Sequence, residues 1–154
     1  MKSQNLSRRD FLKNASLASG LLILPSGFLR GENAPSNRIN TAHIGVGGMG
    51  GGDLNGVGNI NGVSVVALCD VDSGRLNSAA EGVRKKRNAS PKTFSDYRKL
   101  FDEVGKDIDA VVVSTPDHTH FTVAYSAVDL GKHVYVQKPL CHTIDQVRRL
   151  SKRA

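Results

Sequence analysis

Cysteine is scarce in this sequence. Cys69 and Cys141 are the only two among 154 residues, and no C-x-x-C pair is present. This excludes a disulfide framework and a zinc knuckle. Long apolar runs are also missing, because the longest near the N-terminus, 15–24, is too short for a comfortable membrane span. No internal repeat or low-complexity stretch occurs, and the length suits one domain.

Basic charge is distributed unevenly along the chain. The net charge is +7, and residues 1–38 hold 6 of the 21 Lys and Arg but 2 of the 14 acidic residues, a net of +4. The remainder, at +3, is only mildly basic. Its dense cluster, RKKR at 84–87, has no interleaved aromatic residues of the kind that nucleic-acid surfaces use. We interpret the cluster as the solvated end of a helix and expect no nucleic-acid partner.

Residues 1–38 do not resemble part of a folded domain. The stretch Ser7–Lys13, SRRDFLK, matches the twin-arginine export motif, and the apolar segment 15–24 and a polar linker follow it. We therefore expect a twin-arginine signal peptide and linker, with a periplasmic or exported product that meets the twin-arginine export machinery. No small-x-small cleavage site is convincing, so an uncleaved membrane anchor stays open, as does a chance match in a basic tail.

The stretch 39–70 carries the clearest motif. An apolar run leads into the sequence GVGGMG, and a second apolar run ends at Asp70, twenty residues after Gly50. The order is that of a dinucleotide-binding βαβ unit: strand, glycine turn, helix, strand and acid. In such a unit Gly45 allows the sharp turn, Gly47 lets the backbone approach a pyrophosphate, and Gly50 lets the helix pack closely.

The acid at the end of the second run bears on the choice of cofactor. Asp70 would accept hydrogen bonds from the adenosine ribose and repel a 2′-phosphate, so we expect NAD and regard NADP as the less favoured cofactor. The helix N-terminus would face the pyrophosphate. A flexible glycine-rich loop is the alternative, but the flanking strands and the acid in register favour the nucleotide site.

Strands and helices alternate over the rest of the chain. We predict strands at 40–45, 63–69, 92–94, 109–114 and 133–137, and helices beginning near Gly50, at 72–87, 95–104 and 120–130, and after Thr143. Asp72 and Ser95 would cap two helices, and Thr143 with Gln146 forms a capping box. The alternation predicts an α/β fold over 39–154, a Rossmann-type doubly wound parallel sheet.

Ligands of such sheets lie beyond the carboxyl ends of the strands. The loops there are STPDHTH at 114–120 and QKPLCHT at 137–143. With the glycine motif, Asp70, the T-P-x-x-x-H loop and the K-P pair in this order, the chain from Ile39 resembles the N-terminal domain of the glucose–fructose oxidoreductase / inositol dehydrogenase / rhizopine catabolism (Gfo/Idh/MocA) family.

The resemblance implies roles for particular residues. Cofactor-binding positions would be Gly45, Gly47, Gly48, Met49 and Gly50 at the pyrophosphate, Asp70 at the ribose, Arg75 along the adenine, Ser114, Thr115, Pro116 and His120 at the nicotinamide half, and Gln137 and Lys138 in the following loop. Lys138 matches the lysine of the family's E-K-P motif and would be catalytic, orienting a substrate hydroxyl. Gln137 departs from the family's usual Glu; it can hydrogen-bond but cannot act as a base.

Two further expectations concern ligands and completeness. His118 and His120 with Asp117 could form a metal site, but only His142 offers a third ligand, so we expect none. The resemblance implies a second domain that supplies substrate specificity and the oligomer interface; we expect it to be missing here, so that the domain is truncated and a homo-oligomer would need that missing part. The resemblance implies an NAD-dependent oxidoreductase acting on a small sugar or polyol; a redox-neutral NAD-dependent glycosidase and a non-catalytic dinucleotide-binding fragment are the alternatives.

Overall fold

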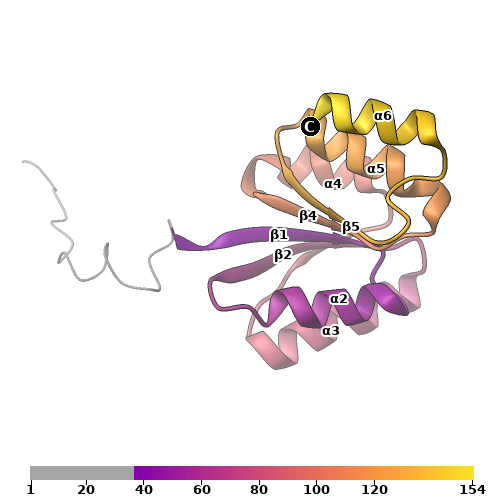
Figure 1. Cartoon of the computed structure of the whole chain (residues 1–154). Coiled ribbons are helices and arrows are strands. Elements are labelled where there is room, and N and C mark those ends of the chain that lie inside the picture. Colours follow the sequence, from indigo (N-terminus) through magenta and orange to yellow (C-terminus); the bar gives the residue numbers. More distant parts are fainter. Residues whose placement is uncertain (1–36) are drawn as a thin grey trace, which may run out of the picture. The chain divides into compact units, whose positions relative to one another are not determined.

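The computed structural model describes residues 37–154 (Figure 1). The expected twin-arginine motif and its apolar segment lie outside the described residues. The elements are β1 (Ile39–Ile44), α2 (Met49–Gly58), β2 (Val63–Cys69), α3 (Ser73–Arg87), β3 (Lys92–Phe94), α4 (Tyr97–Val104), a 3₁₀ turn (Gly105–Asp107), β4 (Ala110–Val113), α5 (Asp117–Asp129), β5 (His133–Val136) and α6 (Ile144–Arg153).

The sheet has five strands in the order β3-β2-β1-β4-β5, and every pairing is parallel. Helices α2 and α3 cover one face, and α4, α5 and α6 cover the other (Figure 1). This confirms the Rossmann-type doubly wound fold. From β1 the chain builds outward to β2 and β3, and it then returns to add β4 and β5 on the other side. The carboxyl ends of β1 and β4 are therefore the topological switch point, where such sheets bind ligands.

Two apolar layers hold the helices against the sheet. Ala42, Val111 and Val113 are fully buried in the layer shared with α4 and α5, whereas Leu68 is fully buried in the layer below α2 and α3. Because both faces are covered, β2 (VSVVALC) and β4 (AVVV) are mostly apolar runs, whereas the central β1 (INTAHI) also buries the polar side chains of Thr41 and His43. This packing fixes the strand ends, and with them the loops that follow.

Two predicted helix starts were wrong. Helix α4 is capped by Asp96, whose carboxylate accepts from the Arg98 backbone N–H at 3.0 Å, and not by Ser95. Helix α5 begins at Asp117 and not at His120. Pro116 precedes it with φ −58°, a value already suited to a helix start, and the Asp117 carboxylate favours the first turn. The early start places His118 and Thr119 on the helix.

The remaining boundaries agree closely with expectation. Strands β2 and β3 and the Asp72 cap of α3 lie where predicted, and Thr143 and Gln146 form the full capping box of α6. Within residues 37–154, no helix combines the length and the apolar character needed to cross a bilayer.

Candidate functional site

The glycine turn after β1 is built on close backbone contacts. Gly45 has φ +82°, and a Cβ on it would lie 2.6 Å from the carbonyl oxygen of Ser114. A Cβ on Gly50 would lie 2.0 Å from the carbonyl oxygen of Gly45. Both positions therefore require glycine, and together they bring the start of α2 against the turn and the end of β4.

The N-terminus of α2 is open. It has no side-chain cap and no acidic residue in its first turn, whereas Asp72, Asp96 and Thr143 cap α3, α4 and α6. Backbone N–H groups and the aligned peptide dipoles at such an end favour an anion. The turn and the open helix end are thus suited to a phosphate group.

Asp70 lies directly against the glycine turn. Its Oδ2 accepts from the backbone N–H of Val46 at 2.9 Å, and its Oδ1 accepts from that of Asp72 at 3.0 Å. The carboxylate is half-exposed and held in one orientation, with lone pairs left to accept from a ligand. The structure therefore brings Asp70 into contact with the glycine turn, although Gly45 and Asp70 are twenty-five positions apart in the sequence.

A pocket of about 520 Å³ opens at the switch point beside these groups. The predicted site residues that line it are Gly45, Gly47, Asp70, Arg75, Ser114, Thr115 and Pro116. The predicted cofactor-binding residues did not include Ser95, Asp96, Tyr97 and Arg98 after β3, nor His118, Thr119 and Thr122 of α5, of which His118 was considered only as a metal ligand. The strand-end rule, applied also to β3, would have found the first group; the second depends on where α5 begins.

Comparison with known proteins gives the family. The model described as "Oxidoreductase family, NAD-binding Rossmann fold" (GFO_IDH_MocA) matches residues 39–154. The chain belongs to this family. The open glycine turn, the fixed acid and the pocket between them fit the NAD that Gfo/Idh/MocA domains bind, so this is an NAD-binding domain.

Individual relatives are similar in the same region. A protein named glycosyl hydrolase family 109 protein from Solibacter usitatus (strain Ellin6076) is 33% identical over 91% of this chain and 34% of its own length. Inositol 2-dehydrogenase from Salmonella typhimurium (strain LT2) is 32% identical over 70% of this chain and 30% of its own. The crystal structure of myo-inositol dehydrogenase from Lactobacillus casei with NAD(H) and myo-inositol has a TM-score of 0.63 and 28% identity, over 75% of this chain and 33% of that one. The chain spans about a third of the length of these relatives.

Most charged side chains near Asp70 in the NAD pocket form ion pairs with one another. Arg75 lies 3.6 Å from Asp72, and Arg98 lies 2.7 Å from Asp96. The hydrogen bonds from Arg98 lower the pKa of Asp96 to about 2, so this carboxylate is ionised. Among residues 37–154, no Lys or Arg forms an ion pair with Asp70. One uncompensated negative charge therefore remains where an adenosine ribose would lie, which favours NAD.

Arg75 lies beside the turn itself. A Cβ on Gly47 would meet its Cδ at 2.4 Å, so the aliphatic part of Arg75 covers Gly47. The Arg75 side chain is exposed. Its predicted place along the adenine stays a prediction.

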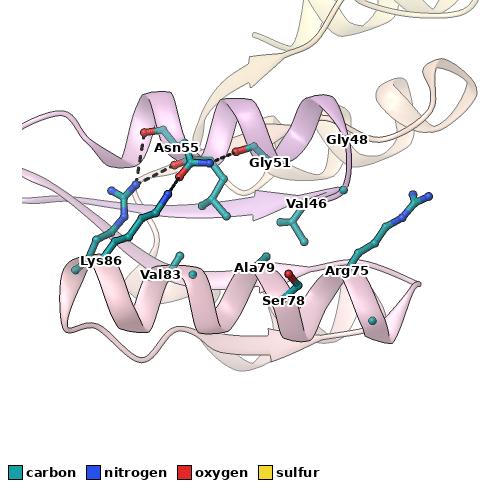
Figure 2. A pocket seen from close by; sticks show the side chains of 14 residues that line it. Val46, Gly48, Gly51, Asn55, Arg75, Ser78, Ala79, Val83 and Lys86 are labelled. Atoms are coloured by element: carbon teal, nitrogen blue, oxygen red, sulfur yellow. Dashed lines mark hydrogen bonds between the residues drawn. The ribbon is translucent and has the colours of Figure 1, made fainter.

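A second hollow, of about 490 Å³, lies between α2 and α3 (Figure 2). Small residues line it, including Gly51, Ser78 and Ala79, and Arg75 and Lys86 stand at its opposite ends (Figure 2). The Lys86 ammonium donates to the Asn55 side chain at 3.2 Å. This groove follows from small side chains on facing helices, and it shares Gly47 of the glycine turn and Arg75 of α3 with the NAD pocket.

His120 is not on the pocket wall. It is 2% exposed, and its Nδ1 and Nε2 each lie 2.7 Å from a backbone carbonyl oxygen, those of Pro139 and Thr115. The ring therefore links the loops after β4 and β5 from behind, rather than lining the nicotinamide half as expected. Within the described part of the chain, no group of three or more His, Cys, Asp or Glu side chains is placed to hold a metal.

The remaining predicted residues lie around the pocket. Gly48 borders the second hollow, Met49 is 69% exposed, and Gly50 is buried beneath the turn. Gln137 and Lys138 follow β5, and Lys138 is exposed. Neither belongs to the pocket lining, but Gln137 hydrogen-bonds Asp53 of α2, a residue that the sequence gave no reason to select.

Proposed function

We propose that this chain is the cofactor domain of an enzyme that oxidises a CH–OH group of a sugar or polyol. The observation that carries the proposal is the meeting of the glycine turn, Asp70 and Ser114 in one pocket at the switch point. The substrate class rests on the inositol dehydrogenases among the relatives. The activity belongs to a protein as long as those relatives, of which this chain corresponds to about a third.

Each part of the site has a role in this proposal. The turn and the amides of α2 bind the diphosphate, and Asp70 accepts from the ribose hydroxyls. The wall formed by Ser114, Thr115 and Pro116 borders the nicotinamide half. When bound, NAD supplies a nicotinamide carbon that accepts hydride from the substrate. Lys138, exposed at the end of β5, is the candidate to orient the substrate hydroxyl and to help move its proton.

A redox-neutral glycosidase is the second candidate. The relative named glycosyl hydrolase family 109 protein favours it, because its similarity covers 91% of this chain. Such an enzyme would use the same NAD pocket, and it would return the hydride before product release. The two candidates differ in one measurable quantity, the net formation of NADH.

Turnover by a protein of the relatives' length, in which this domain is joined to a substrate domain, tests these candidates. We would supply NAD with a panel of polyols and aryl glycosides, and compare wild type with Lys138→Met. NADH formation that Lys138→Met abolishes without loss of NAD binding supports the dehydrogenase. Glycoside cleavage with no net NADH supports the second candidate instead. NAD binding with neither activity in that longer protein contradicts both candidates and favours a non-catalytic nucleotide-binding role instead.

Export by the twin-arginine machinery is a separate proposal. It is supported by the stretch SRRDFLK at 7–13. Replacing Arg8 and Arg9 by Lys preserves the charge but changes the side-chain chemistry that the motif is named for. We expect cell fractionation to move the variant from the periplasm or membrane to the cytoplasm. An unchanged distribution would refute the proposal.

A further inference from the structure

Asp53 joins three elements behind the NAD pocket. It lies on α2, one turn after Gly50, and is half-buried. The Ser114 hydroxyl, at the end of β4, donates to its Oδ2 at 2.6 Å. The Gln137 amide, at the end of β5, donates to its Oδ1 and Oδ2 at 3.0 and 2.9 Å. One carboxylate thus holds the strand ends that carry both loops of the nicotinamide half.

The chemistry of this contact fixes what residue 137 can be. An ionised carboxylate only accepts hydrogen bonds, so its partner must donate. Gln137 donates through Nε2, and its Oε1 accepts from the Lys138 backbone N–H at 3.2 Å. A Glu at 137 would place two carboxylates about 3 Å apart, and both could not stay ionised without a large cost. Asp53 therefore explains why this chain has Gln where the family usually has Glu.

Neutral donors, the Gln137 amide and the Ser114 hydroxyl, are the side chains that bind the Asp53 carboxylate. Among residues 37–154, no Lys or Arg forms an ion pair with it. His43 of β1 is the titratable group that interacts with it electrostatically from the sheet. Burial, aided by the positive charge of Arg87 on α3, lowers the pKa of His43 to about 4. His43 is therefore neutral above about pH 5 and supplies no countercharge.

We propose that Asp53 is a positioning residue for NAD binding, which acts by holding Gln137 and Ser114 so that the loops after β4 and β5 are fixed against α2. The inference rests on the NAD site of the proposed function. It implies that residues 53 and 137 form a matched pair of one carboxylate and one amide. Replacing the carboxylate at 53 by an amide, or the amide at 137 by a carboxylate, keeps the hydrogen bond between them only if the other residue is exchanged as well.

The test is an exchange of the two groups in the full chain. We would prepare Asp53→Asn, Gln137→Glu and the double variant, and measure NAD dissociation constants by calorimetry and unfolding temperatures without NAD. We expect Gln137→Glu to weaken NAD binding by roughly tenfold at pH 8, and Asp53→Asn by a few fold. The double variant restores one amide and one carboxylate, so its affinity should return to within about threefold of wild type.

A pH series separates positioning from general damage. In Gln137→Glu, a proton shared by the two carboxylates restores a hydrogen bond. Its NAD affinity should therefore rise as pH falls from 8 to 5.5, whereas wild type and the double variant stay nearly constant. Gln146→Glu is the matched control, because Gln146 Oε1 only accepts, from the His142 and Thr143 N–H groups. The same chemical change there should leave NAD affinity unaltered.

Several outcomes overturn the inference. It fails if Gln137→Glu binds NAD as wild type does at pH 8, or if the double variant gains nothing over both single variants. Should Gln137→Glu not fold, Gln137→Met removes the donor without adding charge, and unchanged NAD affinity in that variant refutes the inference. Absence of NAD binding by wild type would instead refute the proposed function.

Discussion

Gly50→Ala is the substitution that the turn should tolerate least. Its new Cβ would lie 2.0 Å from the carbonyl oxygen of Gly45, 2.8 Å from the Gly45 carbonyl carbon and 3.1 Å from Ser114 Cβ. Two of these contacts are backbone, so no side chain can rotate away. Real Cβ atoms rarely come closer than 3.0 Å to another atom, so the start of α2 must move by about 1 Å.

That movement has two measurable consequences. Overpacking of a closely packed contact costs about 1–3 kcal/mol or more, so we expect a lower unfolding free energy in chemical denaturation. The shift also moves the amides at the N-terminus of α2 away from the pyrophosphate, so the NAD dissociation constant should rise by roughly tenfold or more.

Gly52→Ala provides the control on the same helix. A Cβ on Gly52 meets no atom within 4 Å. Alanine is the better helix former by about 1 kcal/mol, so this variant should be slightly more stable and bind NAD as wild type does. Equal stability and equal NAD affinity for the two alanine variants would refute the packing argument.

Three other properties follow from the same structure. Because the pKa of His43 in the folded chain is about 4, only the unfolded chain takes up a proton on this histidine as pH falls from about 6.5 to 4. The free energy of unfolding should therefore drop by about 3 kcal/mol over this range in a series of denaturant titrations, and His43→Leu should abolish that drop. Burial, together with the negative charges of Asp70 and Asp96, raises the pKa of the Cys69 thiol to about 12. Iodoacetamide at pH 8 should therefore label Cys69 only after unfolding, and labelling of Cys69 in the folded chain would contradict this. Thr143→Ala removes the capping-box oxygen and should cost about 1 kcal/mol in thermal unfolding, whereas Thr143→Ser should keep most of it.

Much of the fold could be predicted because its signals are local. The apolar run Val63–Cys69 and the short stretch Lys92–Phe94 after Pro91 became strands with the expected bounds. Asp72 and Thr143 cap helices because a side-chain oxygen can reach N–H groups three residues on. The wrong start of α4 arose from local ambiguity, because Ser95 and Asp96 are adjacent and both are good N-cap residues. Asp96, whose carboxylate also binds the Arg98 side chain, is the cap in the structure.

The site was predictable only where its chemistry is carried by a motif. The glycine turn and Asp70 lie on one βαβ unit with fixed spacing. The contacts of Asp53 join residues 61 and 84 positions away, and nothing in the local sequence indicates them. His120 was expected at the end of the loop after β4 but lies in the first turn of α5, and the burial of its ring depends on how the loops after β4 and β5 close over it.

The central claim is that NAD binds over the N-terminus of α2, with Asp70 at the ribose. Calorimetric titration of the full chain with NAD and with NADP, at one pH and ionic strength, tests it most directly. We predict saturable binding of one NAD per chain, and binding of NADP weaker by roughly tenfold or more, because the 2′-phosphate would meet the Asp70 carboxylate. No binding of NAD, or tighter binding of NADP, would contradict the claim.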